Sequence, residues 1–286
     1  MIKTSGRMEF GGYERSYVLL TPAAIDPDET YPLVLALHGG GGSGERMCSL
    51  KGGIQELAAQ QDLIVACPSG IDKHWNDGRQ TNRSRAHAED IDDVGFLLEL
   101  VSQLVGQHPV DPGRVYVTGM SNGGMMSLRM ACEASAVFRA AAPVISSLPA
   151  DLDCEPSNPI SILIMNGTED PLVPWEGGEV RAFLRPLGAV LSTPETVRYW
   201  VERNRCDPQA IAEWLPDRTM TDESRIEVAR YMDCAEGASV ALFTVHGAGH
   251  TWPGGSQYLP VFLIGATNGD IHAGQAIWDF FASRSL

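Results

Sequence analysis

Apolar runs alternate along this chain with segments of helical periodicity, and that alternation restricts the fold more than any other feature. Strands are expected at residues 16–20, 33–38, 63–67, 114–118, 140–145, 160–166, 226–232 and 240–246, and helices at 50–61, 92–107, 122–133, 196–204 and 272–283. Continuous apolar runs are typical of central strands covered on both faces. The sequence therefore predicts an α/β fold with a mostly parallel central sheet and helices on both faces. In such sheets ligands bind beyond the carboxyl ends of the strands.

Length and charge limit the remaining classes of protein. The chain has 286 residues and no internal repeat or low-complexity linker, so we expect one domain over residues 1–286. Its 21 Lys and Arg against 36 Asp and Glu give a net charge of −15. Nucleic acid and anionic membranes are not expected as partners, because binding phosphate groups requires an excess of cationic side chains.

The sequence carries no apolar run of about 20 residues that could span a bilayer. Its first residues also lack the apolar core of a signal peptide. The sequence is thus compatible with a cytoplasmic protein or with an exported one whose signal has been removed. The six cysteines allow 15 pairings, so the sequence alone does not fix any connectivity.

A glycine-rich segment, HGGGGSG, directly follows the expected strand at 33–38. Successive glycines let a backbone turn tightly and aim N–H groups at a bound oxygen. No G-K-[ST] follows, so this is not a P-loop for phosphate. A flexible linker is the alternative, but the position after a buried strand favours backbone donors for an oxyanion, at Gly40 or Gly41.

The segment VYVTGMSNGGMMSLRM contains a G-x-S-x-G match between a β-branched run and a helical run. Strand, sharp turn and helix in that order is the context that makes this pattern a nucleophile elbow. Ser121 would project its hydroxyl from the turn, and the N–H of Asn122 would donate to an oxyanion. The alternative is a structural turn with an inert serine.

Two later strand ends supply a carboxylate and a base, as a serine nucleophile requires. Asp170 lies in a turn after the strand at 160–166 and is preferred to its neighbour Glu169. His250 lies in a glycine-rich loop after the strand at 240–246, whereas His246 ends the strand itself. Glycines flank both histidines and no third ligand is evident, so a metal site is not expected. Serine, aspartate and histidine follow the chain order of an α/β-hydrolase triad.

Three tryptophans lie on loops of the same expected face. They are Trp75, Trp175 and Trp252. They predict an aromatic-walled substrate cleft, with ordinary core packing as the alternative for each.

Taken together, these motifs resemble those of a known esterase group. The segments are HGGGGSG, PSGIDKHWNDGR, DDVGF, RVYVTGMSNGGMMSLRMACE, NGTEDPLVPW, GAGHTWPGG and IWDFFA. They look like the group that contains polyhydroxybutyrate depolymerases and feruloyl or acetyl-xylan esterases. The resemblance runs from about Tyr13 to Phe281 and implies an α/β-hydrolase fold and hydrolysis of carboxylic esters without a cofactor. It also implies Ser121, Asp170 and His250 as the triad.

The same resemblance bears on the cysteines and on location. Cys132 and Cys154, and Cys206 and Cys234, stand at positions similar to disulfide positions in exported members of the family. Two bridges are therefore expected from the resemblance, and with them a secreted or periplasmic protein. Cys48 and Cys67 are left open, as a third bridge or as two thiols.

Within this family we expect a feruloyl or related hydroxycinnamoyl esterase, because tryptophans could stack on a phenolic ring. A poly(3-hydroxybutyrate) or short-chain hydroxyalkanoate depolymerase, or an acetyl-xylan esterase, is the alternative. The sequence lacks the Ser/Thr-rich linker and polymer-binding domain of larger depolymerases. The substrate is thus expected to be a small or a polysaccharide- or polyester-linked ester. A serine peptidase or a non-catalytic binding module is disfavoured.

Overall fold

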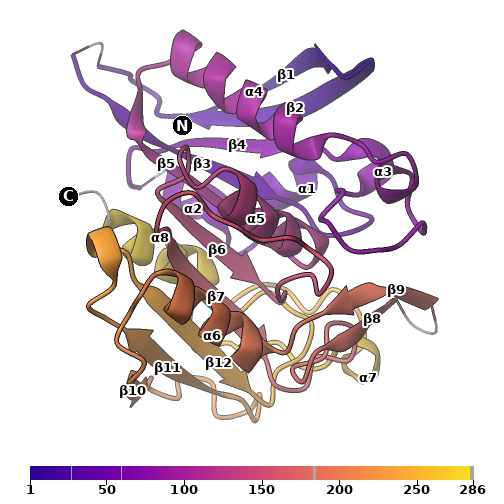
Figure 1. Ribbon diagram of the computed structural model, residues 1–286. Helices are drawn as coiled ribbons and strands as arrows, with labels where there is room; N and C mark the ends of the chain where they lie inside the picture. The colour runs from indigo at the N-terminus through magenta and orange to yellow at the C-terminus, as the bar shows by residue number, and fades with distance from the viewer. Residues whose placement is uncertain (27, 59, 183–184, 284–286) are drawn as a thin grey trace.

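The computed structural model describes residues 1–26, 28–58, 60–182 and 185–283, and one ten-stranded sheet crosses it from edge to edge (Figure 1). In spatial order its strands are β1 (Ile2–Phe10), β2 (Tyr13–Thr21), β4 (Ile64–Pro68), β3 (Tyr31–Leu37), β5 (Val110–Met120), β6 (Ala140–Val144), β7 (Ser161–Gly167), β12 (Val240–His246), β11 (Arg225–Tyr231) and β10 (Ile211–Trp214). Strands β4 to β12 of this order run parallel, and antiparallel strands flank them on both sides. The expected mostly parallel sheet is confirmed.

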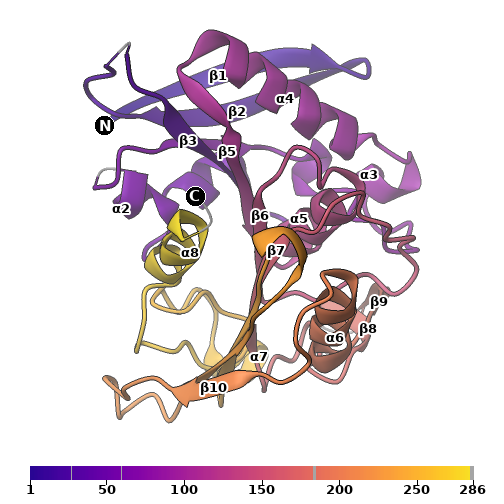
Figure 2. The same ribbon diagram turned by 60° about the vertical axis from the view of Figure 1, so that its left-hand side comes forward.

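Helices cover both faces of this sheet (Figure 2). One face carries α4 (Asp93–Gln107), α5 (Asn122–Glu133) and α6 (Thr193–Arg203), and the other carries α1 (Gly44–Cys48), α2 (Ile54–Ala58) and α8 (Ala273–Ala282). The loops contain α3 (Arg85–Ala88), α7 (Val261–Ile264), two 3₁₀ turns at Ile71–Lys73 and Ala235–Gly237, and a hairpin of β8 (Gly178–Ala182) and β9 (Arg185–Val190). No helix in the described ranges is long and apolar enough to cross a membrane.

Strand β3 illustrates why the central strands are continuously apolar. All seven of its residues are buried, and successive side chains point to opposite faces of the sheet. Leu35 packs in the core beneath α4, α5 and α6, whereas Val34 and Ala36 pack in the core beneath α2 and α8. Because both faces are covered, no position on this strand favours a polar residue.

The structure also contains elements that the sequence did not predict. β1, β8, β9 and β10 have few buried residues, and β10 is exposed along its whole length. Edge strands and hairpins of this kind lack the apolar periodicity on which the expectation depended. The helix expected at 50–61 is also shorter, because Gly52 has a φ of 66° and α2 begins only after this turn.

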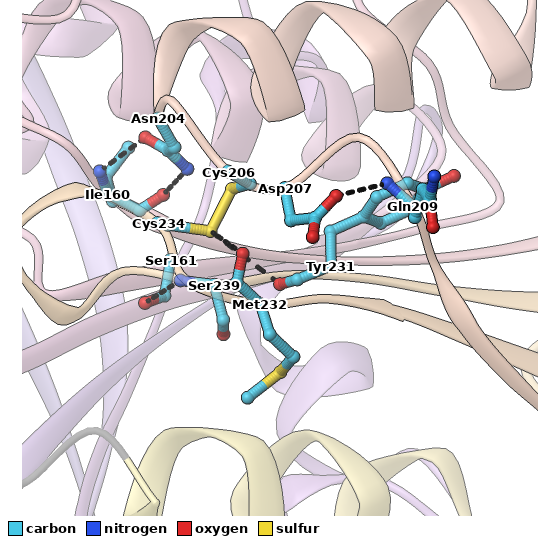
Figure 3. Close-up of a disulfide and its surroundings, with 10 residues drawn as sticks. All are labelled: Ile160, Ser161, Asn204, Cys206, Asp207, Gln209, Tyr231, Met232, Cys234 and Ser239. Atoms are coloured by element: carbon cyan, nitrogen blue, oxygen red, sulfur yellow. Dashed lines mark hydrogen bonds between the residues drawn. A yellow bond between two sulfur atoms is a disulfide. The ribbon is translucent and has the colours of Figure 1, made fainter.

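Three disulfides cross-link segments on both faces of the sheet. The structure joins Cys132 to Cys154, Cys206 to Cys234 and Cys48 to Cys67. The first two are the bridges expected from the family resemblance, and the third resolves the pair that had been left open. Figure 3 shows the Cys206–Cys234 bridge beside Asn204, which accepts from the N–H of Ile160 and donates to its carbonyl. The bridge therefore joins a segment already fastened to the start of β7.

Candidate active site

Ser121 lies at the sharp turn between β5 and α5. Its φ of 53° and ψ of −122° fall in a region that non-glycine residues rarely adopt, and its hydroxyl forms no capping bond to the helix. The turn depends on its glycines: a Cβ on Gly119 would lie 2.4 Å from the Gly123 carbonyl oxygen. Strain of this kind is characteristic of a nucleophile elbow, which holds a serine side chain clear of the sheet.

Asp170 follows β7 and is buried. Its Oδ1 accepts from the backbone N–H groups of Leu172 and Val173 at 2.8 and 2.9 Å. Its Oδ2 lies 2.6 Å from Nδ1 of His250. Glu169, the competing carboxylate, is exposed. The two backbone donors fix the carboxylate in one orientation, so its second oxygen is aimed at the imidazole.

His250 lies in the loop after β12 and is also buried. The hydroxyl of Tyr258 donates to the His250 carbonyl at 2.9 Å, and the His250 N–H donates to the carbonyl of Ile264. With Nδ1 bonded to Asp170, Nε2 remains to accept a proton. His246 instead lies half exposed beside Glu227 and is not part of this group.

Ser121 and His250 line the same cavity, which has a volume of about 470 Å³. This is within the range of cavities that bind small ligands, roughly 300–1,000 Å³. The wall is mostly apolar, and its apolar side chains are Met47, Leu50, Met120, Leu172, Val173, Val180, Ala182, Leu187, Trp252 and Leu259. The cavity lies at the carboxyl ends of the parallel strands, where the sequence places the chemistry.

The glycine-rich segment forms another part of this wall. Gly40 and Gly41 both line the cavity, but the N–H of Gly41 donates to the Lys73 carbonyl at 2.9 Å. The N–H of Gly41 is thus already bonded, so of the two glycines only Gly40 remains a candidate donor to an oxyanion. In the described ranges the N–H of Gly40 has no backbone acceptor. Asn122 lies at the first turn of α5, where helix N–H groups have no partner within the helix.

His38, for which no role was predicted, lines the cavity and is 2% exposed. Its Nε2 accepts from the N–H of Gly70 at 3.0 Å, so the ring proton sits on Nδ1 and points to the Gly39 carbonyl at 2.8 Å. Burial lowers the pKa of His38 to about 4. A neutral imidazole thus anchors the start of the glycine-rich segment. Its position at the end of a buried strand, before four glycines, was the available signal.

The expectation of a cleft walled by three tryptophans is corrected by the structure. Trp75 is fully buried, and its indole N–H donates to the carbonyl of His38. Trp175 is half buried, packs against the core and does not line the cavity. Trp252 alone of the three lines it, with its indole N–H donating to Gly52. The side chains of Trp75 and Trp175 pack against the core. The prediction failed for these two because the position of a residue on a loop does not determine where its side chain points.

No three His, Cys, Asp or Glu side chains within the described ranges are grouped so that they could hold a metal ion. A serine at a strained turn, a histidine with one free nitrogen and a buried carboxylate can together transfer an acyl group.

Comparison with known proteins gives one family match and several relatives. The family model described as the prolyl oligopeptidase family matches residues 55–149. The chain is 33% identical over 288 residues to the putative esterase NocK of Nocardia uniformis subsp. tsuyamanensis, covering 97% of this chain and 82% of NocK. It is 28% identical to feruloyl esterase B of Piromyces equi over 82% of this chain and 42% of that protein. It is 32% identical to feruloyl esterase C of Emericella nidulans over 61% of this chain and 61% of that protein.

Two solved structures share the fold over almost the whole chain. An acetyl xylan esterase from Aspergillus awamori aligns with a TM-score of 0.63 at 16% identity, covering 98% of this chain and 99% of that one. A thermostable esterase aligns with a TM-score of 0.61 at 16% identity, covering 98% of this chain and 62% of that one. At this identity the likeness concerns the arrangement of strands and helices.

Proposed function

The chain belongs to the α/β-hydrolase esterase family and is a carboxylic ester hydrolase, and from this premise we propose that Ser121 is its nucleophile. His250 is the general base and Asp170 orients it. The observation that carries these roles is the 2.6 Å contact between His250 Nδ1 and Asp170 Oδ2 beside the cavity that Ser121 also lines.

The proposed reaction is a two-step acyl transfer. His250 Nε2 takes the proton of the Ser121 hydroxyl as the oxygen attacks the ester carbonyl. The alcohol then leaves with that proton, and an acyl-enzyme remains on Ser121. Water attacks the acyl group by the same route, and His250 returns the proton to Ser121. Asp170 stays ionised throughout and stabilises the imidazolium that forms at each step.

The oxyanion of each tetrahedral intermediate would be held by backbone N–H groups of Asn122 and Gly40. Support comes from their place on the cavity wall and from the absence of a backbone acceptor for Gly40 in the described ranges. Losing one such donor costs roughly 10²- to 10³-fold in kcat.

For the acyl group we propose a feruloyl or related hydroxycinnamoyl moiety. The apolar wall, Trp252 and the feruloyl esterases among the relatives support this proposal. The chain spans less than two thirds of the length of those two esterases, and Trp75 and Trp175 do not contribute to the wall. A short-chain hydroxyalkanoate oligomer is the second candidate, because the apolar side chains of the wall are aliphatic apart from Trp252.

The test compares hydrolysis of methyl ferulate, a hydroxybutyrate oligomer and acetylated xylan at matched enzyme concentration, with Ser121→Ala as the blank. Faster cleavage of methyl ferulate supports the first candidate. Faster cleavage of the oligomer or of acetylated xylan replaces it with the corresponding aliphatic or acetyl esterase. Turnover that Ser121→Ala retains would overturn the mechanism.

We further propose that the protein works outside the cytoplasm on small or polysaccharide-linked esters. The three disulfides support this, since such bonds persist in oxidising compartments. A thiol titration of the unfolded, unreduced protein purified from its natural host tests the location. No free thiol is the expected result, and six free thiols would contradict it.

A further inference from the structure

Asp77 is a fully buried carboxylate outside the group of Ser121, Asp170 and His250. It lies in the loop between β4 and α3, and four side-chain donor atoms reach it, in addition to the backbone N–H of Arg79 at 3.2 Å. Arg79 donates through Nε at 3.0 Å and through Nη2 at 2.7 Å, and His87 Nε2 lies 2.9 Å from Oδ1. The fourth donor is the side-chain amide of Asn122, which lies 2.6 Å from Oδ2.

Asn122 is held on both atoms of its side-chain amide. Its Oδ1 accepts from the N–H of Trp75 at 2.8 Å, and its Nδ2 donates to the Trp75 carbonyl at 2.9 Å as well as to Asp77. Ser121, which directly precedes it, is the proposed nucleophile. Clamping the Asn122 side chain therefore also restricts the peptide unit that carries the proposed oxyanion donor.

Arg79 extends the same group of contacts to the cavity wall. Its Nη1 donates to the carbonyl of Leu187 in β9 at 2.9 Å, and both residues line the cavity. The next residue, Gly188, has a φ of 88°, and a Cβ there would lie 3.0 Å from the Arg79 Cβ. The β8–β9 hairpin thus rests directly on Arg79, and Val180 of the hairpin lines the cavity as well.

The charges of the residues around Asp77 favour its ionised form. Burial by itself would raise the pKa of Asp77, but the Arg79 guanidinium and the bond from His87 hold that pKa well below its ordinary value. His87 in turn lies 2.7 Å from Ser84 Oγ through its Nδ1. A charged acceptor makes stronger hydrogen bonds than a neutral one, so the clamp on Asn122 is firm.

We propose that Asp77 is a positioning residue of the esterase: it fixes Asn122 at the oxyanion and, through Arg79, fixes the β8–β9 hairpin, which forms part of the cavity wall. This inference rests on the proposed function of Ser121. Its two branches have different kinetic consequences. Loss of the Asn122 clamp misdirects an oxyanion donor and lowers kcat, whereas loss of the Arg79 support loosens the wall and raises KM for long acyl chains.

The central test uses Asp77→Asn, which keeps the shape of the side chain and removes its charge. We expect kcat for a p-nitrophenyl ester to fall roughly 10- to 100-fold, because a misplaced donor loses much of its effect. The inhibition constant of an aryl trifluoromethyl ketone, which forms an oxyanion on the serine, should rise by a similar factor. Arg79→Gln should raise the KM for p-nitrophenyl octanoate more than that for the acetate.

Asp93→Asn is the matched control. Asp93 is a buried carboxylate in the same region, paired with Arg15 at 2.5 Å and bonded to the N–H of Asn76, but it does not contact Asn122. We expect this variant to lower the melting temperature without a fall in kcat. If Asp93→Asn and Asp77→Asn lose kcat in parallel with stability, the role of Asp77 is structural only and the inference is wrong.

A second variant covers the case in which Asp77→Asn does not fold. Asn122→Ala cuts the same clamp from the other side and leaves Asp77 with Arg79 and His87. It should lower kcat by a similar factor, and in the double variant the two losses should not multiply, because the residues act as one unit. Full kcat in Asn122→Ala would overturn the inference. If the wild-type protein itself cleaves no ester, the proposed function has failed instead.

Discussion

Substituting alanine for Gly123 tests how tightly the turn at Ser121 is built. Gly123 lies in the first turn of α5, and its backbone does not have a positive φ, so alanine fits the helical conformation itself. Space is the obstacle. A Cβ at this position would lie 2.3 Å from the Leu37 carbonyl oxygen and 2.5 Å from that of His38. Both oxygens belong to the backbone at the end of β3 and cannot rotate away.

The required shift follows from these distances. Real Cβ contacts essentially never fall below 3.0 Å, so the turn and β3 must separate by at least 0.7 Å. A misplacement of about 1 Å at a reacting group can cost about 10²-fold in rate. Overpacking costs about 1–3 kcal/mol, and the helix preference of alanine returns up to about 1 kcal/mol of it. We therefore expect a 10- to 100-fold loss of kcat/KM and a net destabilisation of about 1–2 kcal/mol.

The assay measures kcat/KM for p-nitrophenyl acetate together with urea unfolding. Gly106→Ala in α4 is the control, because a Cβ there meets nothing within 4 Å. That variant should keep the wild-type rate and gain up to about 1 kcal/mol in stability. Wild-type activity and stability in Gly123→Ala would show that the turn is not closely packed against β3, and the reasoning about the elbow would be refuted.

Two further predictions concern buried polar groups. Asp170→Asn should lower kcat by roughly 10⁴-fold with little change in fold, because an amide favours the wrong tautomer of His250; a loss below about tenfold in steady-state assays would contradict this. Because burial lowers the pKa of His38 from 6.5 to about 4, the unfolded state binds more protons in that interval. The free energy of unfolding should therefore fall by about 2 kcal/mol from about pH 7 to about pH 4.5, and His38→Gln should lack this part of the slope in urea titrations. Equal slopes would count against a buried, neutral His38.

Much of the fold could be predicted because apolar runs and local turn residues, which can be read directly from the sequence, determine where its strands and helices lie. The continuous apolar run of β3 requires cover on both faces, and helix α5 begins and ends where the sequence placed it. The position of Ser121 between a strand and a helix follows from local chain geometry, which glycines on either side permit. These features depend on neighbours in the sequence, so the sequence reports them.

Other features depend on contacts between distant segments. Asp77 and Asn122 are 45 positions apart, and no periodicity links them. Trp75 lies on a loop at the active face yet turns into the core, because its indole N–H finds the His38 carbonyl there. The N–H of Gly41 is occupied by Lys73, which only the path of the following loop determines. Side-chain direction and backbone pairing in loops are set by tertiary packing.

The most direct test of the central claim is covalent labelling with a fluorophosphonate, followed by intact mass and peptide mapping. The account predicts one adduct per chain on Ser121, loss of ester hydrolysis in proportion to labelling, and no adduct in Ser121→Ala. Labelling of a different residue, or an active enzyme that the reagent leaves unmodified, would contradict the assignment of Ser121 as the nucleophile.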